Sequence, residues 1–334
     1  MSITLPSGAP TGIGSLPFRD PARAAAFVLD RLPELPAIPT LPKRSPAESM
    51  IAQGVVGIRG ITVGQYGSLA VDLTKVDPEA PVETSLDHGA FDGLLAFLDL
   101  ADPATTSRVK WQIVGPLTLG LTLSRAGVPE EIAFEVAVRA VRAHLQAVRT
   151  RIDEVLPGVQ HVVFIDEPMF TDVQDAEFPL APEVAIDYVS GTLAAIEQFG
   201  ISGVHCCGEG DWGAILAAGP AVLSMPVSQN LVEVSGLLAS FLESGGWIAW
   251  GAIHTDGPVP TSSHRPWRDL NSLWEGLARG GCDLELLRRQ ALVTPACGLF
   301  THAEQVANRV FNILREVSDR LNGCGGSNPL SIGA

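Results

Sequence analysis

The sequence predicts a (β/α)8 (TIM) barrel that forms a single domain, and three observations carry that prediction. Short apolar runs rich in β-branched residues alternate with amphipathic stretches along the chain, and strands that alternate with helices pair in parallel through right-handed crossovers. About eight such units occupy roughly 300 residues, which is the size of this barrel. Reactive or hydrogen-bonding side chains follow most of the runs, at the face where such barrels carry their active sites.

The expected strands are short apolar runs, each followed by a turn signal. In chain order they are Gly12–Leu16, Gly60–Gly64, Val109–Val114, His161–Ile165, Ile201–His205, Ala221–Met225, Trp247–Ile253 and Ala291–Cys297. The helical patterns between them are Ala22–Leu32, Ala90–Leu100, Glu130–Val155, Pro182–Phe199, Trp212–Ala218, Leu231–Leu242, Trp267–Leu277 and His302–Leu321. Asp20 and Pro21 supply a start signal for the first helix. Gly158, Gly200 and Gly280 stand where helices are expected to end.

Residues 1–322 are expected to form the barrel, and residues 323–334, rich in Gly, Ser and Asn, a flexible tail. The prolines between Pro33 and Pro46 are incompatible with an ordinary helix, so the first strand–helix connection is expected to be elaborated. A doubly wound open sheet is the structural alternative. It is disfavoured because no Gly-x-Gly-x-x-Gly follows the first strand.

Composition and charge argue against several classes of function. The 334 residues are 46% apolar and 18% charged, which describes a globular chain with ample core. The formal net charge is −15, from 22 basic and 37 acidic side chains, and such a charge opposes binding to nucleic acid or to an anionic membrane. No apolar run reaches the roughly 18 residues of a membrane span, and residues 1–10 lack a signal-peptide pattern. A cytoplasmic location is therefore expected.

The cysteines do not predict a disulfide framework, because they are odd in number and no secretion signal is present. They are Cys206, Cys207, Cys282, Cys297 and Cys324. His205 and Cys207 lie two residues apart at the end of an expected strand, so their side chains point the same way, whereas Cys206 points to the other side. In a barrel, Cys297 reaches the same face, which gives three ligands suited to zinc and one open position. The alternative is that both cysteines are small buried apolar residues.

A zinc ion held by two thiolates and an imidazole is a poor Lewis acid for water and a good holder of another thiolate. Metal coordination deprotonates a bound thiol near neutral pH, whereas a free thiol with a pKa of about 8.5 is only a few per cent ionised there. The expected site therefore favours alkylation of sulfur over hydrolysis.

Polar residues at the other strand ends indicate how a substrate would be held. They are Ser15, Gln65, Gly115-Pro116, Asp166-Glu167, Ser228 and His254. A carboxylate of Asp166 or Glu167 suits a substrate ammonium, although a helix N-cap explains such a pair equally well. His254 is a candidate proton donor to a leaving group. Ile13-Gly14-Ser15 offers backbone N–H groups and a hydroxyl to a carboxylate.

Six ordered motifs from about residue 11 to residue 322 together suggest a family. They are Ile13-Gly14-Ser15, Gly115-Pro116-Leu117-Thr118, Ile165-Asp166-Glu167-Pro168, His205-Cys206-Cys207, Ile253-His254 and Pro295-Ala296-Cys297-Gly298-Leu299. With them the sequence resembles the C-terminal catalytic barrel of cobalamin-independent methionine synthase, in the superfamily that also contains uroporphyrinogen decarboxylase. The resemblance implies a zinc-dependent transfer of a methyl group to the sulfur of homocysteine, which gives methionine.

The resemblance also implies roles for individual residues. It assigns three zinc ligands, His205, Cys207 and Cys297. Ile13-Gly14-Ser15 would hold the carboxylate of homocysteine and Asp166 its ammonium. Glu48 is an approximate counterpart of a second homocysteine-binding glutamate, and His254 matches the proposed proton donor to the departing methyl carrier.

The sequence departs from the family pattern at several places. The sixth run, Leu223–Asn230, contains no glutamate to serve as a fourth zinc ligand, which leaves Glu209, water or substrate for that position. Gly120 and Leu121 stand near the place of a folate-binding tryptophan, and the N-terminal half of the two-barrel enzymes has no counterpart. Relatives with a His-x-Cys-Gly spelling take the methyl group from a methylated corrinoid protein. A corrinoid protein and methyltetrahydrofolate are therefore the two candidate donors.

Three other functions are consistent with the same residues. The acceptor could be another thiol, such as a coenzyme thiol. A decarboxylase-like lyase of the superfamily would need a ring of basic residues, and the strand ends offer almost none. A zinc-binding or thiol-carrying protein would hold the metal without catalysis.

Overall fold

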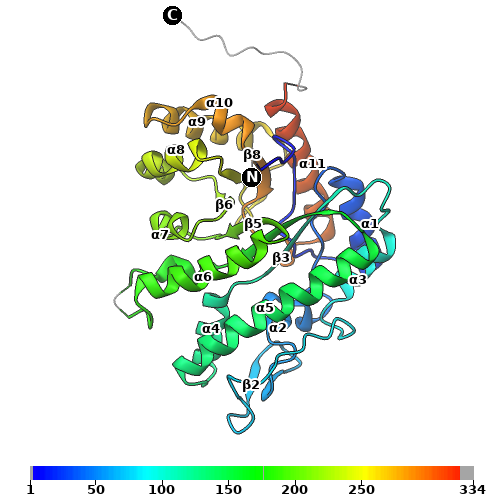
Figure 1. Cartoon of the computed structure of the whole chain (residues 1–334). Coiled ribbons are helices and arrows are strands. Elements are labelled where there is room, and N and C mark those ends of the chain that lie inside the picture. The colour runs from blue at the N-terminus through cyan, green and yellow to red at the C-terminus, as the bar shows by residue number, and fades with distance from the viewer. Residues whose placement is uncertain (1–2, 176, 324–334) are drawn as a thin grey trace, which may run out of the picture.

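The computed structural model describes residues 3–175 and 177–323. Its centre is a parallel sheet of six strands that neighbour one another in sequence order and curl around an interior (Figure 1). The strands are β3 (Arg108–Val114), β4 (Gln160–Asp166), β5 (Gly200–His205), β6 (Val222–Pro226), β7 (Trp247–Ile253) and β8 (Ala291–Pro295). They coincide with the last six expected strands, and helices connect them as parallel pairing requires.

Helices surround the sheet (Figure 1). They are α1 (Pro21–Arg31), α2 (Met50–Gly54), α3 (Asp92–Leu100), α4 (Pro116–Arg125), α5 (Glu130–Val155), α6 (Pro182–Glu197), α7 (Trp212–Ala217), α8 (Ser235–Glu243), α9 (His264–Arg279), α10 (Leu284–Arg289) and α11 (Glu304–Leu321), with short 3-10 turns η1 (Pro46–Glu48), η2 (Pro168–Asp172) and η3 (Gln229–Val234). The Asp20 carboxylate accepts hydrogen bonds from Ala22 and Arg23, so the predicted start of α1 is confirmed. Gly280 caps α9 as expected, whereas Gly200 already opens β5.

Two irregular segments, residues 9–16 and 36–41, lie between β8 and β3. They carry three isolated parallel bridges, which join Pro10 to Val293, Ser15 to Thr40 and Ala37 to Lys110. Backbone hydrogen bonds follow the same path, from Thr11 to β8 (2.9 Å) and from Ile38 to β3 (2.8 Å). The prediction of an α/β fold with a parallel sheet is confirmed for six strands, and in place of the two remaining strands the structure has these bridges.

The predicted second strand, Gly60–Gly64, is wrong as a member of the barrel. Its core forms β1 (Ile61–Val63), which pairs antiparallel with β2 (Leu69–Val71) in a separate hairpin. Gln65 lies in that hairpin and not at a barrel strand end. The proline-rich segment lies beside β3 instead. Prolines can lie in an extended chain but have no N–H to donate to a ladder, so the pairing consists of isolated bridges. The segment that was predicted to be only a connection therefore runs beside β3 as an interrupted strand.

Alternate residues of the six strands point into the interior. Its lower part is a separate apolar cluster that includes Leu5, Leu35, Val162, Val222, Trp247 and Leu292. Toward the carboxyl ends of the strands the side chains become polar: Asp166, His205 and Ser224 are register partners on β4, β5 and β6, and Gln112 of β3 and Thr294 of β8 lie at other levels. A larger apolar cluster fills the space between the sheet and the helices. The fold thus places polar side chains at the carboxyl ends of the strands, above an apolar floor.

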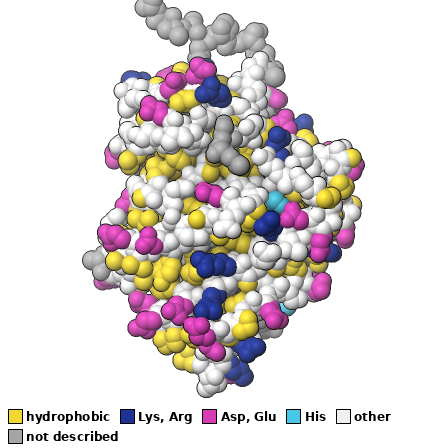
Figure 2. All heavy atoms as spheres, in the orientation of Figure 1, with side chains coloured by type: hydrophobic (Ala, Val, Ile, Leu, Met, Phe, Trp, Pro, Cys, Tyr) yellow, Lys and Arg dark blue, Asp and Glu magenta, His cyan; other side chains and the backbone are white. Residues whose placement is uncertain are grey.

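Acidic side chains are spread over the face in Figure 2, and the Lys and Arg side chains there stand singly or in small groups. Among the described residues, no helix is long and apolar enough to cross a membrane. Of the predicted flexible tail, residues 324–334 lie outside the described part of the chain.

Candidate metal centre and cavity

The side chains of three residues meet at the carboxyl ends of the sheet strands: His205, Cys207 and Cys297. His205 is the last residue of β5, and Cys297 follows the end of β8 by two residues. One ligand atom from each of the three lies within 4.8 Å of the other two. Cys206 is fully buried and belongs to the apolar cluster between sheet and helices. The structure therefore brings together the three residues predicted to be zinc ligands, and together they could hold a metal ion.

The surroundings of His205 fit metal ligation. Its Nδ1 lies 2.9 Å from the Oγ atom of Ser224, the residue directly across from it on β6. An Nδ1–H that donates to Ser224 leaves a lone pair on Nε2, and Nε2 is buried without a hydrogen-bond partner among the described residues. A metal-bound histidine commonly donates its other N–H to an oxygen in this way. A metal ion would supply the partner that Nε2 lacks.

The two thiols perturb each other. The contact with Cys297, helped by His205, lowers the pKa of Cys207 to about 4. The same contact, together with burial, raises the pKa of Cys297. A divalent cation between them would favour the thiolate form of both, and one imidazole with two thiolates is a donor set suited to zinc.

A cavity of about 330 Å³ opens beside the three residues. Much of its lining is apolar, with Ile13, Pro42, Met50, Ile51, Pro168 and Phe300. Polar side chains interrupt that lining at Ser15, Thr40, Ser49, Gln53, Gln112 and Asp166. No Lys or Arg is among the described residues that line it. The cavity therefore suits a small molecule with an apolar body and a few polar groups.

Asp166 and Glu167 have separate environments. Asp166 is 8% exposed, lines the cavity, and its Oδ1 has no hydrogen-bond partner among the described residues. Burial raises its pKa, against the attraction of His205 and Lys110. Glu167 is fully buried and accepts hydrogen bonds from the N–H groups of Leu117 (2.9 Å) and Thr118 (2.8 Å) at the start of α4. Asp166 is thus available to a ligand, while Glu167 fulfils the capping alternative.

The turn Ile13-Gly14-Ser15 lies beside the loop that carries Cys297, and its residues Ile13 and Ser15 line the cavity. Gly14 has φ +144°, and a Cβ atom there would lie 2.2 Å from the amide of Gln112, so only glycine fits. The N–H groups of these three residues donate to no acceptor among the described residues. The loop with Cys297 is held against the turn by a hydrogen bond from Leu299 to the Ser15 carbonyl (2.8 Å).

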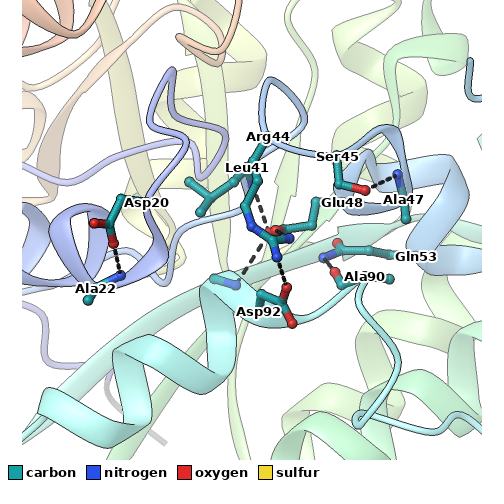
Figure 3. A network of polar contacts seen from close by, with 11 residues as sticks. Asp20, Ala22, Leu41, Arg44, Ser45, Ala47, Glu48, Gln53, Ala90 and Asp92 are labelled. Carbon is teal, nitrogen blue, oxygen red and sulfur yellow. Dashed lines mark hydrogen bonds and ion pairs between the residues drawn. The ribbon is translucent and has the colours of Figure 1, made fainter.

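Glu48 is absent from the cavity lining and belongs instead to a network of polar contacts (Figure 3). Its carboxylate is fully buried and accepts hydrogen bonds from the N–H groups of Leu41 (3.0 Å) and Gly93 (3.3 Å). Arg44 contacts the other carboxylate oxygen (3.1 Å) and also pairs with Asp92. Burial raises the pKa of Glu48 to about 7. The structure therefore does not bring Glu48 to the predicted substrate position, where Gln53 of α2 lines the cavity instead.

His254 and Glu209 also lie apart from the three candidate ligands. His254 is exposed at the end of β7 and is absent from the cavity lining. Glu209 accepts a hydrogen bond from Asn230 (2.8 Å) and a longer one from Ser228 (3.4 Å). Among the described residues, the cluster of candidate metal ligands contains His205, Cys207 and Cys297 only.

Three residues of this site were not predicted from the sequence. Gln112 and Gln53 line the cavity, and Lys110 lies below Gln112 on the same strand. The two-residue period of β3 carries the signal for the pair on that strand, because Lys110 and Gln112 interrupt an apolar run at alternate positions. Nothing in the pattern of residues 50–54 marks Gln53.

Comparison with known proteins identifies the fold. No protein-family model matches the sequence, and no curated protein matches it. A methyltransferase from Methanosarcina mazei has 13% identity and a TM-score of 0.55, over 96% of this chain and 94% of that one. A Listeria monocytogenes protein provisionally named a vitamin-B12 independent methionine synthase has 13% identity and a TM-score of 0.57, over 92% of this chain and 87% of that one. At this identity the likeness is one of fold.

Proposed function

We propose that the protein is a zinc-dependent methyltransferase that methylates the thiol of homocysteine to give methionine. One observation carries the proposal: an imidazole and two thiols converge within 4.8 Å beside a cavity of about 330 Å³. The methyltransferase named among the structures of similar fold, and the methionine synthase provisionally named there, agree with it.

His205, Cys207 and Cys297 would hold the zinc, with Ser224 fixing the ring of His205. When bound, the metal would deprotonate the acceptor thiol and hold it as a thiolate, since coordination lowers the pKa of a thiol far below its usual value of about 8.5. The three protein donors leave a coordination position for that sulfur. No acid among the described residues needs to serve as a fourth ligand.

The other end of the acceptor would be held by groups that lack protein partners. The unpaired Oδ1 of Asp166 suits an ammonium group. The free N–H groups of the turn Ile13-Gly14-Ser15 suit a carboxylate. Homocysteine carries both groups and a thiol, and its apolar methylenes match the lining between them.

Methyl transfer forms a bond from the acceptor sulfur to the methyl carbon while the bond from that carbon to the donor breaks, and the donor leaves with the electron pair. The nitrogen of methyltetrahydrofolate would then need a proton, which is the role predicted for His254. The cobalt of a methylated corrinoid protein keeps the electron pair and needs no proton. The exposed position of His254, outside the cavity lining, favours the corrinoid donor.

A donor assay tests this function. The purified protein is incubated with homocysteine and either methylcobalamin or methyltetrahydrofolate, and methionine is measured. Turnover with methylcobalamin is expected, while turnover with methyltetrahydrofolate alone would exclude the corrinoid donor. If neither donor gives methionine but another thiol, such as a coenzyme thiol, is methylated, the acceptor assignment is wrong and the chemistry stands.

Zinc analysis separates a methyltransferase from the remaining alternatives. Cys297→Ser and His205→Ala should lose zinc, and Cys282→Ser is the matched control, because Cys282 is a buried thiol outside the cluster. Equal zinc in all these proteins would refute the site. A zinc-binding protein without catalysis would hold the metal but methylate no thiol. A decarboxylase-like lyase is disfavoured because no Lys or Arg is among the described residues of the cavity lining.

A further inference from the structure

Lys110 is a positively charged side chain inside the barrel. It is 2% exposed and points inward from β3, one layer below Gln112. Its Nζ atom donates to the carbonyl oxygen of Ile13 and to Oε1 of Gln112 (3.1 Å), and it lies 5.0 Å from the centre of the Phe164 ring. Burial lowers its pKa to about 8, so it is charged at pH 7. A buried ammonium is costly and is retained only where its surroundings compensate it.

Both hydrogen-bond acceptors of Lys110 belong to the cavity wall. Ile13 and Gln112 line the cavity on the side of the predicted carboxylate-binding turn. Because Lys110 has only donors, it fixes the Gln112 amide with Oε1 toward itself. The NH₂ group of Gln112 donates to the Ile38 carbonyl (3.3 Å), which leaves one of its two N–H groups for a ligand. The ammonium thus lies directly behind a wall whose own described side chains include no Lys or Arg. Its field reaches the cavity through one layer of atoms with little water to screen it.

Two roles that involve no ligand account for part of this arrangement. Lys110 ties Ile13 to β3 where the sheet has only isolated bridges, so it helps to close the barrel. It also attracts Asp166 and opposes the effect of burial on that carboxyl. Neither role uses the contact with Gln112, and the hydrogen bonds of Lys110 among the described residues go to Ile13 and Gln112, not to Asp166.

We propose that Lys110 is a specificity-determining residue that makes the wall of Ile13 and Gln112 the anion-binding end of the cavity. The acceptor would then be a thiol with an acidic group at its far end, held by the Gln112 amide and the turn, with its sulfur at the metal ligands. This inference rests on the proposed function and names the class of its acceptor. It assigns Lys110 an effect through Gln112 and not a contact with the substrate.

The test measures the binding of two thiols of equal length to the cobalt(II)-loaded protein at pH 7. The thiols are 3-mercaptopropionate, which is anionic, and 3-mercapto-1-propanol, which is neutral. Binding is followed by the thiolate-to-cobalt absorption band, so no methyl donor is needed. The Lys110→Met variant is expected to lose about tenfold in the affinity ratio of anionic to neutral thiol, the order of effect that one buried charge exerts at this range.

The Gln112→Glu variant provides a second measurement that keeps Lys110 in place. The new carboxylate would accept from Lys110 and neutralise it, so the same loss of ratio is expected without removal of the tie to Ile13. An unchanged ratio in both variants would overturn the inference, as would an equal loss of affinity for both thiols, which a purely structural Lys110 predicts. If the cobalt-loaded wild-type protein bound neither thiol, the proposed function would fail and the inference with it.

Discussion

The Glu48→Gln variant tests how the cavity wall is held. Glu48 accepts from the N–H groups of Leu41 and Gly93 and contacts Arg44 (Figure 3). It thereby ties the segment around Leu41, whose neighbours Thr40 and Pro42 line the cavity, to the start of α3. Two effects compete at its carboxylate. Burial disfavours the ionised form, while Arg44 and the two N–H groups favour it. Burial is the larger effect, and it raises the pKa of Glu48 from 4.5 to about 7.

The raised pKa sets the sign and size of the expected result. Below pH 4.5 Glu48 is protonated in both the folded and the unfolded protein, so its contribution to stability is complete there. As the pH rises toward 7, the unfolded chain ionises first, and this contribution is lost. A pKa of about 7 instead of 4.5 corresponds to about 3 kcal/mol. The stability of Glu48→Gln minus that of the wild type should therefore rise by about 3 kcal/mol between pH 4.5 and 8.

Urea unfolding, followed by tryptophan fluorescence at several pH values in this range, measures the difference. Other titrating groups act equally in both proteins and cancel. Glu131→Gln, at an exposed position of α5, is the control for the loss of a surface carboxylate. A flat difference for Glu48→Gln would show that its pKa is not raised. A difference that falls with rising pH would show that Arg44 and the N–H groups outweigh burial.

Three further predictions concern the site itself. Ser224→Ala frees Nδ1 of His205, so zinc affinity measured against a competing chelator should fall about 10- to 100-fold while the urea midpoint stays within error. Gly14→Ala places a Cβ 2.2 Å from the Gln112 amide at φ +144°; zinc content should be unchanged and KM for homocysteine should rise at least tenfold, and an unchanged KM would remove the turn from the site. Asp166→Asn should weaken homocysteine binding at least tenfold and leave 3-mercaptopropionate, which has no ammonium, largely unaffected.

The parts of the fold and site that the sequence predicted depend on short-range patterns. Runs of apolar residues predicted the six strands. The two-residue period of an extended chain predicted that the side chains of His205 and Cys207 point the same way. Cys297 required one more step, which was that parallel strands end at the same face. These inferences need only local geometry and one topological rule.

The parts that it did not predict depend on which partner a polar group chooses. Glu48 and Asp166 are both acids near apolar runs, yet one turns to backbone N–H groups and the other to the cavity. His254 follows a strand as His205 does, yet its side chain is exposed. The proline-rich segment hid its place in the sheet, because a chain that lacks N–H donors carries no strand signal. Such choices are settled by tertiary packing, which a residue pattern does not record.

The irregular closure of the sheet lies where the acceptor would bind, and the two features explain each other. A regular strand at residues 12–15 would spend its N–H groups on a neighbouring strand. Here the segment is joined to its neighbours by isolated bridges only, and the N–H groups of Ile13, Gly14 and Ser15 donate to no described acceptor. The three carbonyl groups of this turn already accept hydrogen bonds, from Lys110, Thr40 and Leu299, so its unpaired backbone groups are the N–H groups. Unpaired buried N–H groups are costly, so an acidic ligand that accepts from them should stabilise the protein against unfolding even without metal.

The melting temperature of the zinc-free protein measures this effect. We expect it to rise with homocysteine or 3-mercaptopropionate and to stay unchanged with 3-mercapto-1-propanol. Equal shifts for the acidic and neutral thiols would show that the unpaired N–H groups have no part in binding.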